Sequence, residues 1–339
     1  MDDDILHILL GFLGTAAILG ILVVLVGVGE VAAAFGLLEP GAVGLILAAG
    51  LAWLGAWSLA LGRVLRTLRI PVSTRGAVLL YASAAFANNV TPFGQAGGEP
   101  FSALLISRAT DTEYERGLAA IASVDSLNFV PSIALALVGL AYYVARFTVG
   151  DRILVVIAVV VGLAVAIPLA GYGLWIGRAR VRSVVAHTLT PLVGAIAGVI
   201  PRLEAPEPAT IRHRIDNFYG AIGRVATGGG NLALAMAYST VGWLMLATTL
   251  WLSLWAIGHP VPATIVIIVV PVGTIASVAP LPGGAGGVEA ATVLLLVPTT
   301  GVSAATAGAA AIIFRGATYW VPTVLGGLAA AWLQGRTGA

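Results

Sequence analysis

The chain has 339 residues, of which 59% are hydrophobic and only 9% are charged. Soluble domains carry roughly 25% charged residues, so this composition excludes an ordinary water-soluble protein and indicates a chain solvated by lipid. The net charge of +2 does not suggest nucleic-acid binding, and the absence of cysteine excludes disulfides, thiol catalysis and cysteine-ligated metals.

Continuous apolar runs predict an all-α polytopic membrane protein, because only helices and closed barrels satisfy their backbone in a bilayer, and barrel strands would alternate. A helix needs about 20 apolar residues to cross a hydrocarbon core of roughly 30 Å. The last apolar stretch is interrupted at Arg315-Gly316 and Pro322, so it is either one kinked span or two short helices. Runs of spanning length are 5–29 (interpreted as a retained first helix, not a cleaved signal), 42–62, 117–145, 153–176, 232–257 and the stretch 303–333.

Two further apolar runs, 77–90 and 264–279, are too short to cross, at about 21 and 24 Å as helices. Each leads into a Gly/Pro-rich stretch, 91–100 or 280–289, and then into a second short helix expected to start near Pro100 or Glu289. Each therefore predicts either a re-entrant hairpin or a broken span. With the long runs they make about six to eight transmembrane helices and two broken hairpins, 77–108 and 264–298.

Arginine placement sets the expected orientation, because cytoplasmic loops are enriched in basic residues. We expect both termini in the cytoplasm, the first hairpin entering from the cytoplasmic side and the second from outside, in one membrane domain over 1–339. The region 177–229 is then a cytoplasmic connection, in which 183–200 is a candidate interfacial helix. Arg146 and Arg152 break the rule, and the residues that follow it are Arg63, Arg66, Arg69, Arg75, Arg108, Arg116, Arg178, Arg180, Arg182, Arg202, Arg212, Arg214 and Arg224.

The two Gly/Pro stretches match each other, which predicts an inverted repeat with a binding site where the halves meet. Helices that begin inside the membrane point N–H groups toward its interior, and such ends attract anions, above all phosphate. The alternative is that the glycines only make tight turns and that Glu99 and Glu289 only cap helix dipoles. The candidate residues are Pro92, Gln95, Gly97, Gly98 and Glu99 in the first stretch, and Pro282, Gly283, Gly284, Gly286, Gly287 and Glu289 in the second.

Ionisable groups at membrane depth are costly, at roughly 2.5–3.5 kcal/mol each, and are therefore candidates for function. Arg315 is suited to binding a lipid phosphate through its planar fork, with Glu99, Asp125 or Glu289 as its counter-ion at rest. The alternative for Asp125 is a structural ion pair with Arg315. The other polar candidates are Asn88, Asn89, Asn128 and Tyr319, whereas tryptophans near span ends need only be interface anchors.

No nucleophile set, metal-ligand spacing or P-loop is present in the sequence. We therefore expect no enzymatic activity, no cofactor and no metal. The expected partners are membrane lipids with an anionic, phosphate-bearing head group.

Three motifs, NNVTPFGQAGGE at 88–99, PGGAGGVEA at 282–290 and RGATYWVP at 315–322, are shared in order and spacing with a known family. With them, nearly the whole chain resembles the flippase-like transmembrane family that includes the membrane half of lysylphosphatidylglycerol synthases. Many members have a basic residue shortly after the first acid, whereas here Glu99 is followed by Arg108 as the next basic residue. The QAGGEP form is similar to the archaeal branch, which favours an isoprenoid lipid.

The resemblance implies a flippase or scramblase that moves an aminoacylated phospholipid or a polyprenyl-phosphate-linked lipid between leaflets of the cell membrane. A lipid-modifying synthase or glycosyltransferase is a further candidate partner. Two rival functions stay open at this point. One is a secondary transporter of a small soluble anion, and the other is a non-transporting subunit of a lipid-modifying enzyme.

Overall fold

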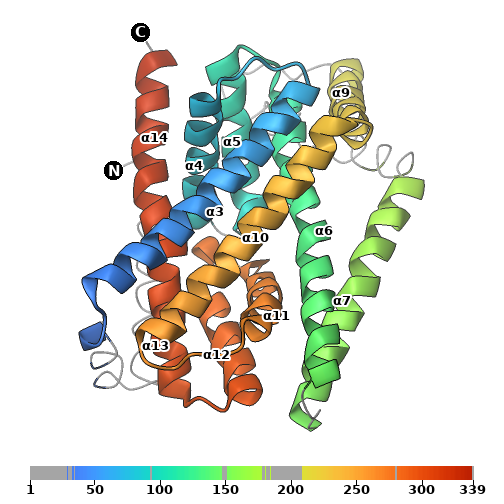
Figure 1. The fold of residues 1–339 in the computed structure, drawn as a ribbon. Coiled ribbons are helices and arrows are strands. Elements are labelled where there is room, and N and C mark those ends of the chain that lie inside the picture. Colours follow the sequence, from blue (N-terminus) through green and yellow to red (C-terminus); the bar gives the residue numbers. More distant parts are fainter. Residues whose placement is uncertain are drawn as a thin grey trace.

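The computed structural model describes residues 35–91, 94–146, 151–177, 208–278 and 281–337, together with 29, 33, 180 and 184. Every regular element among these residues is helical, which confirms the all-α prediction (Figure 1). The elements are α3 (Pro40–Thr67), α4 (Thr74–Val90), α5 (Gln95–Thr110), α6 (Tyr114–Arg146), α7 (Asp151–Ile176), α9 (Pro208–Ala226), α10 (Gly230–Ala256), α11 (Ala263–Thr274), η1 (Ile275–Val278), η2 (Pro282–Gly284), α12 (Gly287–Thr300), α13 (Ala304–Arg315), η3 (Gly316–Trp320) and α14 (Val321–Thr337).

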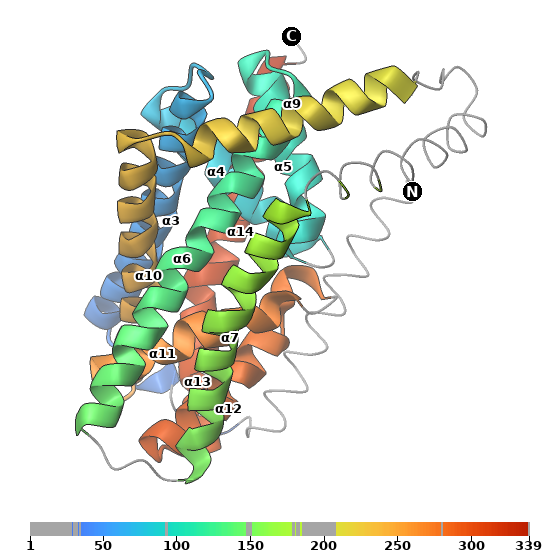
Figure 2. The same ribbon diagram turned by 90° about the vertical axis from the view of Figure 1, so that its right-hand side faces the viewer.

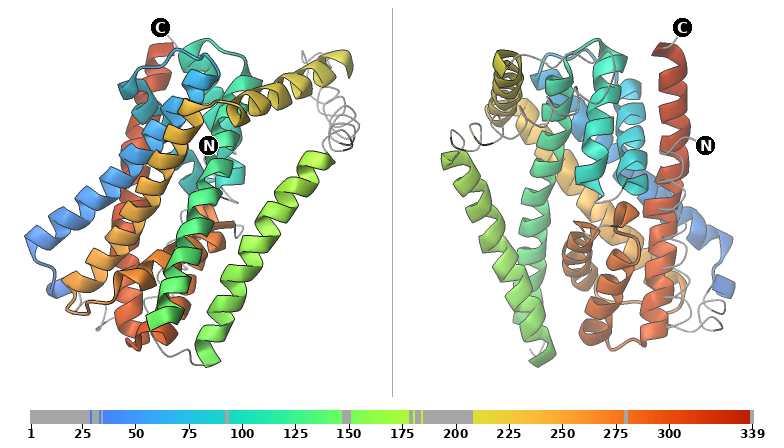
Figure 3. Two further views of the ribbon diagram at one scale, coloured as in Figure 1. Left: turned by 45° about the vertical axis from the view of Figure 1, so that its right-hand side comes forward. Right: turned by 180° about the vertical axis from the view of Figure 1, so that it is seen from behind.

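The long helices α3, α6 and α10 contain three of the predicted spans. By length and composition each is apolar enough to cross a membrane. The tilted helices α3 and α10 run side by side in opposite directions, while α7 stands at the edge of the bundle (Figures 1 and 3). The first expected span, 5–29, lies outside the described residues except for its last position.

The short helices form two pairs at opposite ends of the bundle. The pair α4–α5 occupies the upper half of Figure 1, and the pair α11–α12 occupies the lower half. Their inner ends, where each pair reverses direction, approach each other between these halves, and η2 packs against both α4 and η1. The two reversals therefore lie in the interior of the bundle and not in surface loops.

The first reversal is shorter than the sequence suggested. Helix α5 begins at Gln95, so the expectation that it starts near Pro100 is wrong, and Gly97, Gly98 and Glu99 are helical. Gly94 has a left-handed φ of 53° directly before the helix, and its carbonyl already accepts a hydrogen bond from Gly98 N at 3.0 Å. Pro100 removes only one backbone bond from a helix that is already established, so it does not stop the helix. Residues 92 and 93 lie outside the described part.

The last stretch is one continuous helical rod with a π-helical segment, which decides between the two alternatives left by the sequence. Helices α13, η3 and α14 follow each other without a gap. The amide of Val321 donates to the carbonyl of Gly316, a wide i to i−5 turn directly before Pro322. Because Pro322 has no N–H to donate, the widened turn accommodates it without breaking the rod.

Helix α9 lies across one end of the bundle, where the sequence predicted only a polar connection (Figure 2). Its Arg214 is 3.3 Å from Glu115 at the start of α6. Most of the candidate interfacial helix 183–200 lies outside the described residues.

The arginines at helix ends are distributed unevenly. Arg66, Arg108 and Arg224 lie in the last turns of α3, α5 and α9. These turns lie at the same end of the bundle, whereas the last turn of α6, which contains Arg146, lies at the other (Figure 1). The arginines in the last turns of α3, α5 and α9, which the sequence assigned to one side of the membrane, thus lie at one end of the bundle, and Arg146, which broke the rule, lies at the other.

Gly326 determines how closely α14 approaches α4, which provides a test of the packing. A Cβ at Gly326 would lie 2.0 Å from Ala82 O and 2.8 Å from Phe86 Cβ. We expect Gly326→Ala to lower the free energy of unfolding by about 1–3 kcal/mol, because the two backbones must separate. Thermal unfolding in detergent measures this. Gly55→Ala in α3 is the control, because a Cβ there meets no atom within 4 Å and alanine favours the helix. Equal melting temperatures for the two variants would contradict the packing argument.

Candidate functional site

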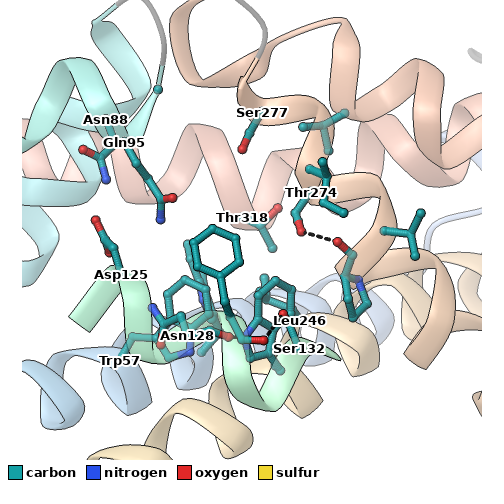
Figure 4. Close-up of a pocket in the computed structure, with 18 of the residues that line it drawn as sticks. Trp57, Asn88, Gln95, Asp125, Asn128, Ser132, Leu246, Thr274, Ser277 and Thr318 are labelled. Atoms are coloured by element: carbon teal, nitrogen blue, oxygen red, sulfur yellow. Dashed lines mark hydrogen bonds between the residues drawn. The ribbon is translucent and has the colours of Figure 1, made fainter. Parts of the chain in front are cut away.

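A cavity of about 360 Å³ lies where the two pairs of short helices meet. Its lining comes from α3, α4, α5, α6, α7 and α10 and from α11, α12 and α13 (Figure 4). Its polar lining residues come from both halves of the chain. Apart from tryptophans, they are Tyr81, Asn88, Asn89, Gln95, Asp125, Asn128, Ser132, Thr274, Ser277, Arg315 and Thr318.

The two reversals touch each other at glycines. A Cβ on Gly94, at the first reversal, would lie 3.0 Å from the carbonyl oxygen of Ser277, which leads into the second reversal. Gly283, with a φ of 55°, faces Asn89, whose Cα would be 3.1 Å from an added Cβ. These glycines let the backbones of two distant segments approach as no larger residue would allow.

Arg315 is held by three groups of the second half. Its Nε donates to Glu289 Oε1 at 2.9 Å, and its Nη2 donates to Gly283 O at 3.0 Å. The guanidinium carbon lies 4.3 Å from the centre of the Tyr319 ring, a cation–π contact. Among the described residues Nη1 makes no hydrogen bond, and Arg315 lines the cavity. The guanidinium is therefore fixed in position with donor capacity left over.

Glu289 is the acid that pairs with Arg315, which settles the choice among the three candidates. Its side chain is 2% exposed, and that of Arg315 is 11% exposed. The structural alternative for Asp125, an ion pair with Arg315, is therefore not what the structure has. Glu289 also lies in the first turn of α12, where its charge favours the helix dipole.

Two helices begin at the cavity without side-chain caps. The residues before α5 and α12 are Gly94 and Gly286, and neither offers a capping side chain. Gly94, Gln95 and Val288 line the cavity. The first N–H groups of a helix have no intrahelical acceptor, so these two ends add partial positive charge near Arg315.

Asp125 and Asn128 are on α6 and face the cavity from another side. Asn128 is held by α10, since Ser239 Oγ donates to its Oδ1 at 2.5 Å and Trp243 Nε1 donates to its carbonyl at 2.8 Å. Among the described residues, the buried Asp125 Oδ2 and Asn128 Nδ2 have no hydrogen-bond partner. Figure 4 shows Asp125 beside Asn88 and Gln95. This wall thus presents polar atoms that a ligand would satisfy.

The adjacent asparagines of α4 have different surroundings. Asn89 Nδ2 donates to Tyr319 O at 3.2 Å and to Thr323 Oγ1 at 2.8 Å, and Tyr319 Oη donates to Asn89 O at 3.0 Å. Asn89 and Tyr319 therefore join α4 to the rod of α13, η3 and α14. Asn88 Oδ1 is buried without a partner in the described part of the chain.

The profile of the lysylphosphatidylglycerol synthase transmembrane region matches residues 8–326 of this chain. The chain belongs to this family. Two UPF0104 membrane proteins of Methanothermobacter thermautotrophicus are similar to it, each at 24% identity. The alignments cover 95% and 94% of this chain and 92% of each relative. The family membership and the apolar helices identify an integral membrane protein, and these relatives agree with the resemblance to archaeal members.

The predicted site residues of this family member divide into two groups. The structure brings Asn88, Asn89, Gln95, Asp125, Asn128, Gly283 and Arg315 to the cavity wall. The others do not line it: Gly97, Gly98, Glu99, Pro282, Gly284, Gly286, Gly287, Glu289 and Tyr319 lie behind the wall or form its turns, and Pro92 lies outside the described residues. Gly98, for example, has its role in packing, since a Cβ there would lie 2.0 Å from Asn88 Oδ1.

No three His, Asp or Glu side chains in the described ranges are close enough to hold a metal ion.

Three tryptophans were missed as cavity residues. Trp53, Trp57 and Trp243 are buried at the cavity, and the sequence analysis gave none of them a role in the site. Trp57 makes edge-on contacts with Trp53 and Trp243, each with ring centres 5.4 Å apart. Gly242 makes room for this cluster, because a Cβ there would overlap the Trp57 ring. The available signal was their place in the middle of predicted spans, since anchors belong at span ends.

Proposed function

We propose that this chain moves an anionic lipid between membrane leaflets, as a flippase or scramblase with no chemical reaction of its own. The observation that carries the proposal is Arg315, held rigidly at an interior cavity with Nη1 free of any hydrogen bond to the described residues. The proposed substrates are an aminoacylated phospholipid or a polyprenyl-phosphate-linked lipid. The tails stay in the surrounding lipid while the head group passes through the cavity.

The phosphate of the head group binds Arg315 in this proposal. Arginine presents donors in a planar fork that suits phosphate, and a guanidinium held by Glu289, Gly283 and Tyr319 loses little further freedom on binding. The uncapped beginnings of α5 and α12 add partial positive charge. Together these groups replace part of the hydration that the phosphate loses on entering the bundle.

The placement of the short helices suggests how the cavity is reached. The pairs α4–α5 and α11–α12 lie at opposite ends of the bundle, and we propose that they are corresponding parts of an inverted repeat. Movement of one half against the other opens the cavity to each leaflet in turn. The arginine-rich end of the bundle is then cytoplasmic, with both termini on that side of the cell membrane.

Reconstitution tests the proposal. Liposomes containing the purified chain and a fluorescent phosphatidylglycerol or polyprenyl phosphate are expected to exchange the probe between leaflets at least about tenfold faster than empty liposomes, a lowering of the barrier by about 1.4 kcal/mol. Chemical quenching of the outer leaflet measures the exchange. Rates equal to those of empty vesicles for both probes would rule out lipid movement. Saturable uptake of a soluble anion instead would favour the small-anion transporter.

A further inference from the structure

Asp125 is the buried acid for which the lipid proposal provides no role. It is 6% exposed, lines the cavity, and its Oδ2 has no hydrogen-bond partner among the described residues. An isolated buried carboxylate is expensive, so such a group persists where it binds a cation or takes up a proton. The surrounding amides of Asn88, Gln95 and Asn128 carry no charge that would compensate it.

The charges around the cavity favour proton uptake. The charge of Arg315 is already balanced by Glu289, so the resting cavity has a net negative charge when Asp125 is ionised. A phosphate group that enters adds a second negative charge to the same buried space. Like charges in a space of low dielectric constant repel strongly, so the two anions disfavour each other unless one is neutralised.

We propose that Asp125 takes up one proton when the anionic head group binds, so that lipid and proton cross the membrane together. The inference rests on the proposed function, and it adds an energy source, because a proton gradient then drives lipid in its own direction. The carboxylate accepts the proton from cavity water on one side and returns it to water on the other. No bond other than that O–H bond forms or breaks.

The titratable neighbours of Asp125 are few. Tyr81 of α4 and Glu99 of α5 interact with it electrostatically. Arg315 of α13 is the remaining titratable group on the cavity wall, and the lining residues of α3, α7, α10, α11 and α12 carry none. Glu99 lies behind the wall, so it is the rival proton acceptor that an experiment must separate from Asp125.

Linkage fixes the sign of the pH effect. If binding takes up a proton, affinity is highest at low pH and falls by up to about tenfold per pH unit as pH rises. Affinity for the lipid changes with pH only between two values: the pH at which Asp125 is half protonated in the empty cavity and the pH at which it is half protonated in the occupied cavity. Asparagine at position 125 has nearly the same shape as protonated aspartate and cannot exchange a proton.

Calorimetry of dioctanoyl phosphatidylglycerol binding to the full chain in detergent tests this inference. Binding heats in Hepes and in imidazole differ in proportion to the protons taken up. We expect close to one proton for the native chain and close to none for Asp125→Asn. Glu115→Gln is the matched control on the same helix, because Glu115 pairs with Arg214 away from the cavity, and it is expected to retain the uptake.

Binding without proton uptake by the native chain would overturn the inference and leave the proposed function standing. Uptake that persists in Asp125→Asn but disappears in Glu99→Gln would also overturn it. If the native chain neither binds the short-chain lipid nor moves the long-chain probes, both proposals fall. In liposomes, an acidic exterior is expected to speed inward lipid movement by the native chain, whereas Asp125→Asn does not respond to the gradient.

Discussion

Replacing Arg315 with glutamine should lower lipid transport at least about 100-fold, which corresponds to about 2.7 kcal/mol. The side chain loses its positive charge and its planar fork, and a charge-assisted hydrogen bond is worth roughly 1.5–3 kcal/mol. Leaflet exchange of fluorescent phosphatidylglycerol in liposomes measures the loss. Arg315→Lys retains the charge without the fork, so its rate should fall between those of the native chain and Arg315→Gln.

The single substitution also leaves Glu289 buried and unpaired, which costs roughly 3–5 kcal/mol of stability. The double variant Glu289→Leu with Arg315→Met removes both charges, and well-packed apolar residues of similar volume are often as stable as the buried ion pair that they replace. We therefore expect the double variant to melt near the native temperature and yet to transport no lipid. Native transport by that stable double variant would show that the ion pair serves the fold alone.

Gly283→Ala should both destabilise the fold and reduce transport at least about tenfold, because the added methyl group disturbs the contact between the reversals. Its Cβ would lie 2.4 Å from Tyr319 Cε2 and 3.1 Å from Asn89 Cα. Overpacking costs about 1–3 kcal/mol, and the left-handed backbone adds about 1–2 kcal/mol. The strain moves the carbonyl that accepts the hydrogen bond from Arg315 Nη2, so the guanidinium loses its fixed position.

Gly301→Ala is a control that has the cost of a left-handed backbone without the cost of overpacking. Gly301 has a φ of 75°, similar in kind to that of Gly283, but a Cβ there meets no atom within 4 Å. This control should lose about 1–2 kcal/mol of stability from the backbone and keep its transport rate. Thermal unfolding and leaflet exchange of the two variants give the comparison. Indistinguishable results for both glycines would contradict a special role for the contact between the reversals.

Features that depend on residues close together in sequence were predictable. The spans in α3, α6 and α10 follow from apolar length, and the short pairs follow from runs that end at Gly/Pro stretches. Asp125 and Arg315 were recognisable because a charge inside an apolar run is expensive wherever it lies. These signals need no knowledge of which helices become neighbours.

Features that depend on contacts between distant segments were not predictable from this sequence. The partner of Arg315 could be any of three acids, and only the fold selects Glu289. Gly98 looked like a turn glycine, although it is helical and makes room for Asn88. The burial of Trp57 depends on α10, whose Ser239 carbonyl accepts a hydrogen bond from the indole at 3.2 Å. In each case the deciding neighbour is fixed by tertiary packing.

The π-helical segment Gly316–Trp320 has a consequence for how the two ends of its rod are aimed. An α-helix advances about 100° per residue. A turn that holds one extra residue therefore leaves everything beyond it rotated by about 100°, compared with a regular α-helix of the same residues. Arg315 before the segment is aimed at the cavity, and Gly326 beyond it is aimed at Ala82. A regular α-helix that kept every residue here would turn α14 by about 100° and carry its glycine face away from α4, whereas deleting one residue of the segment would preserve the present alignment.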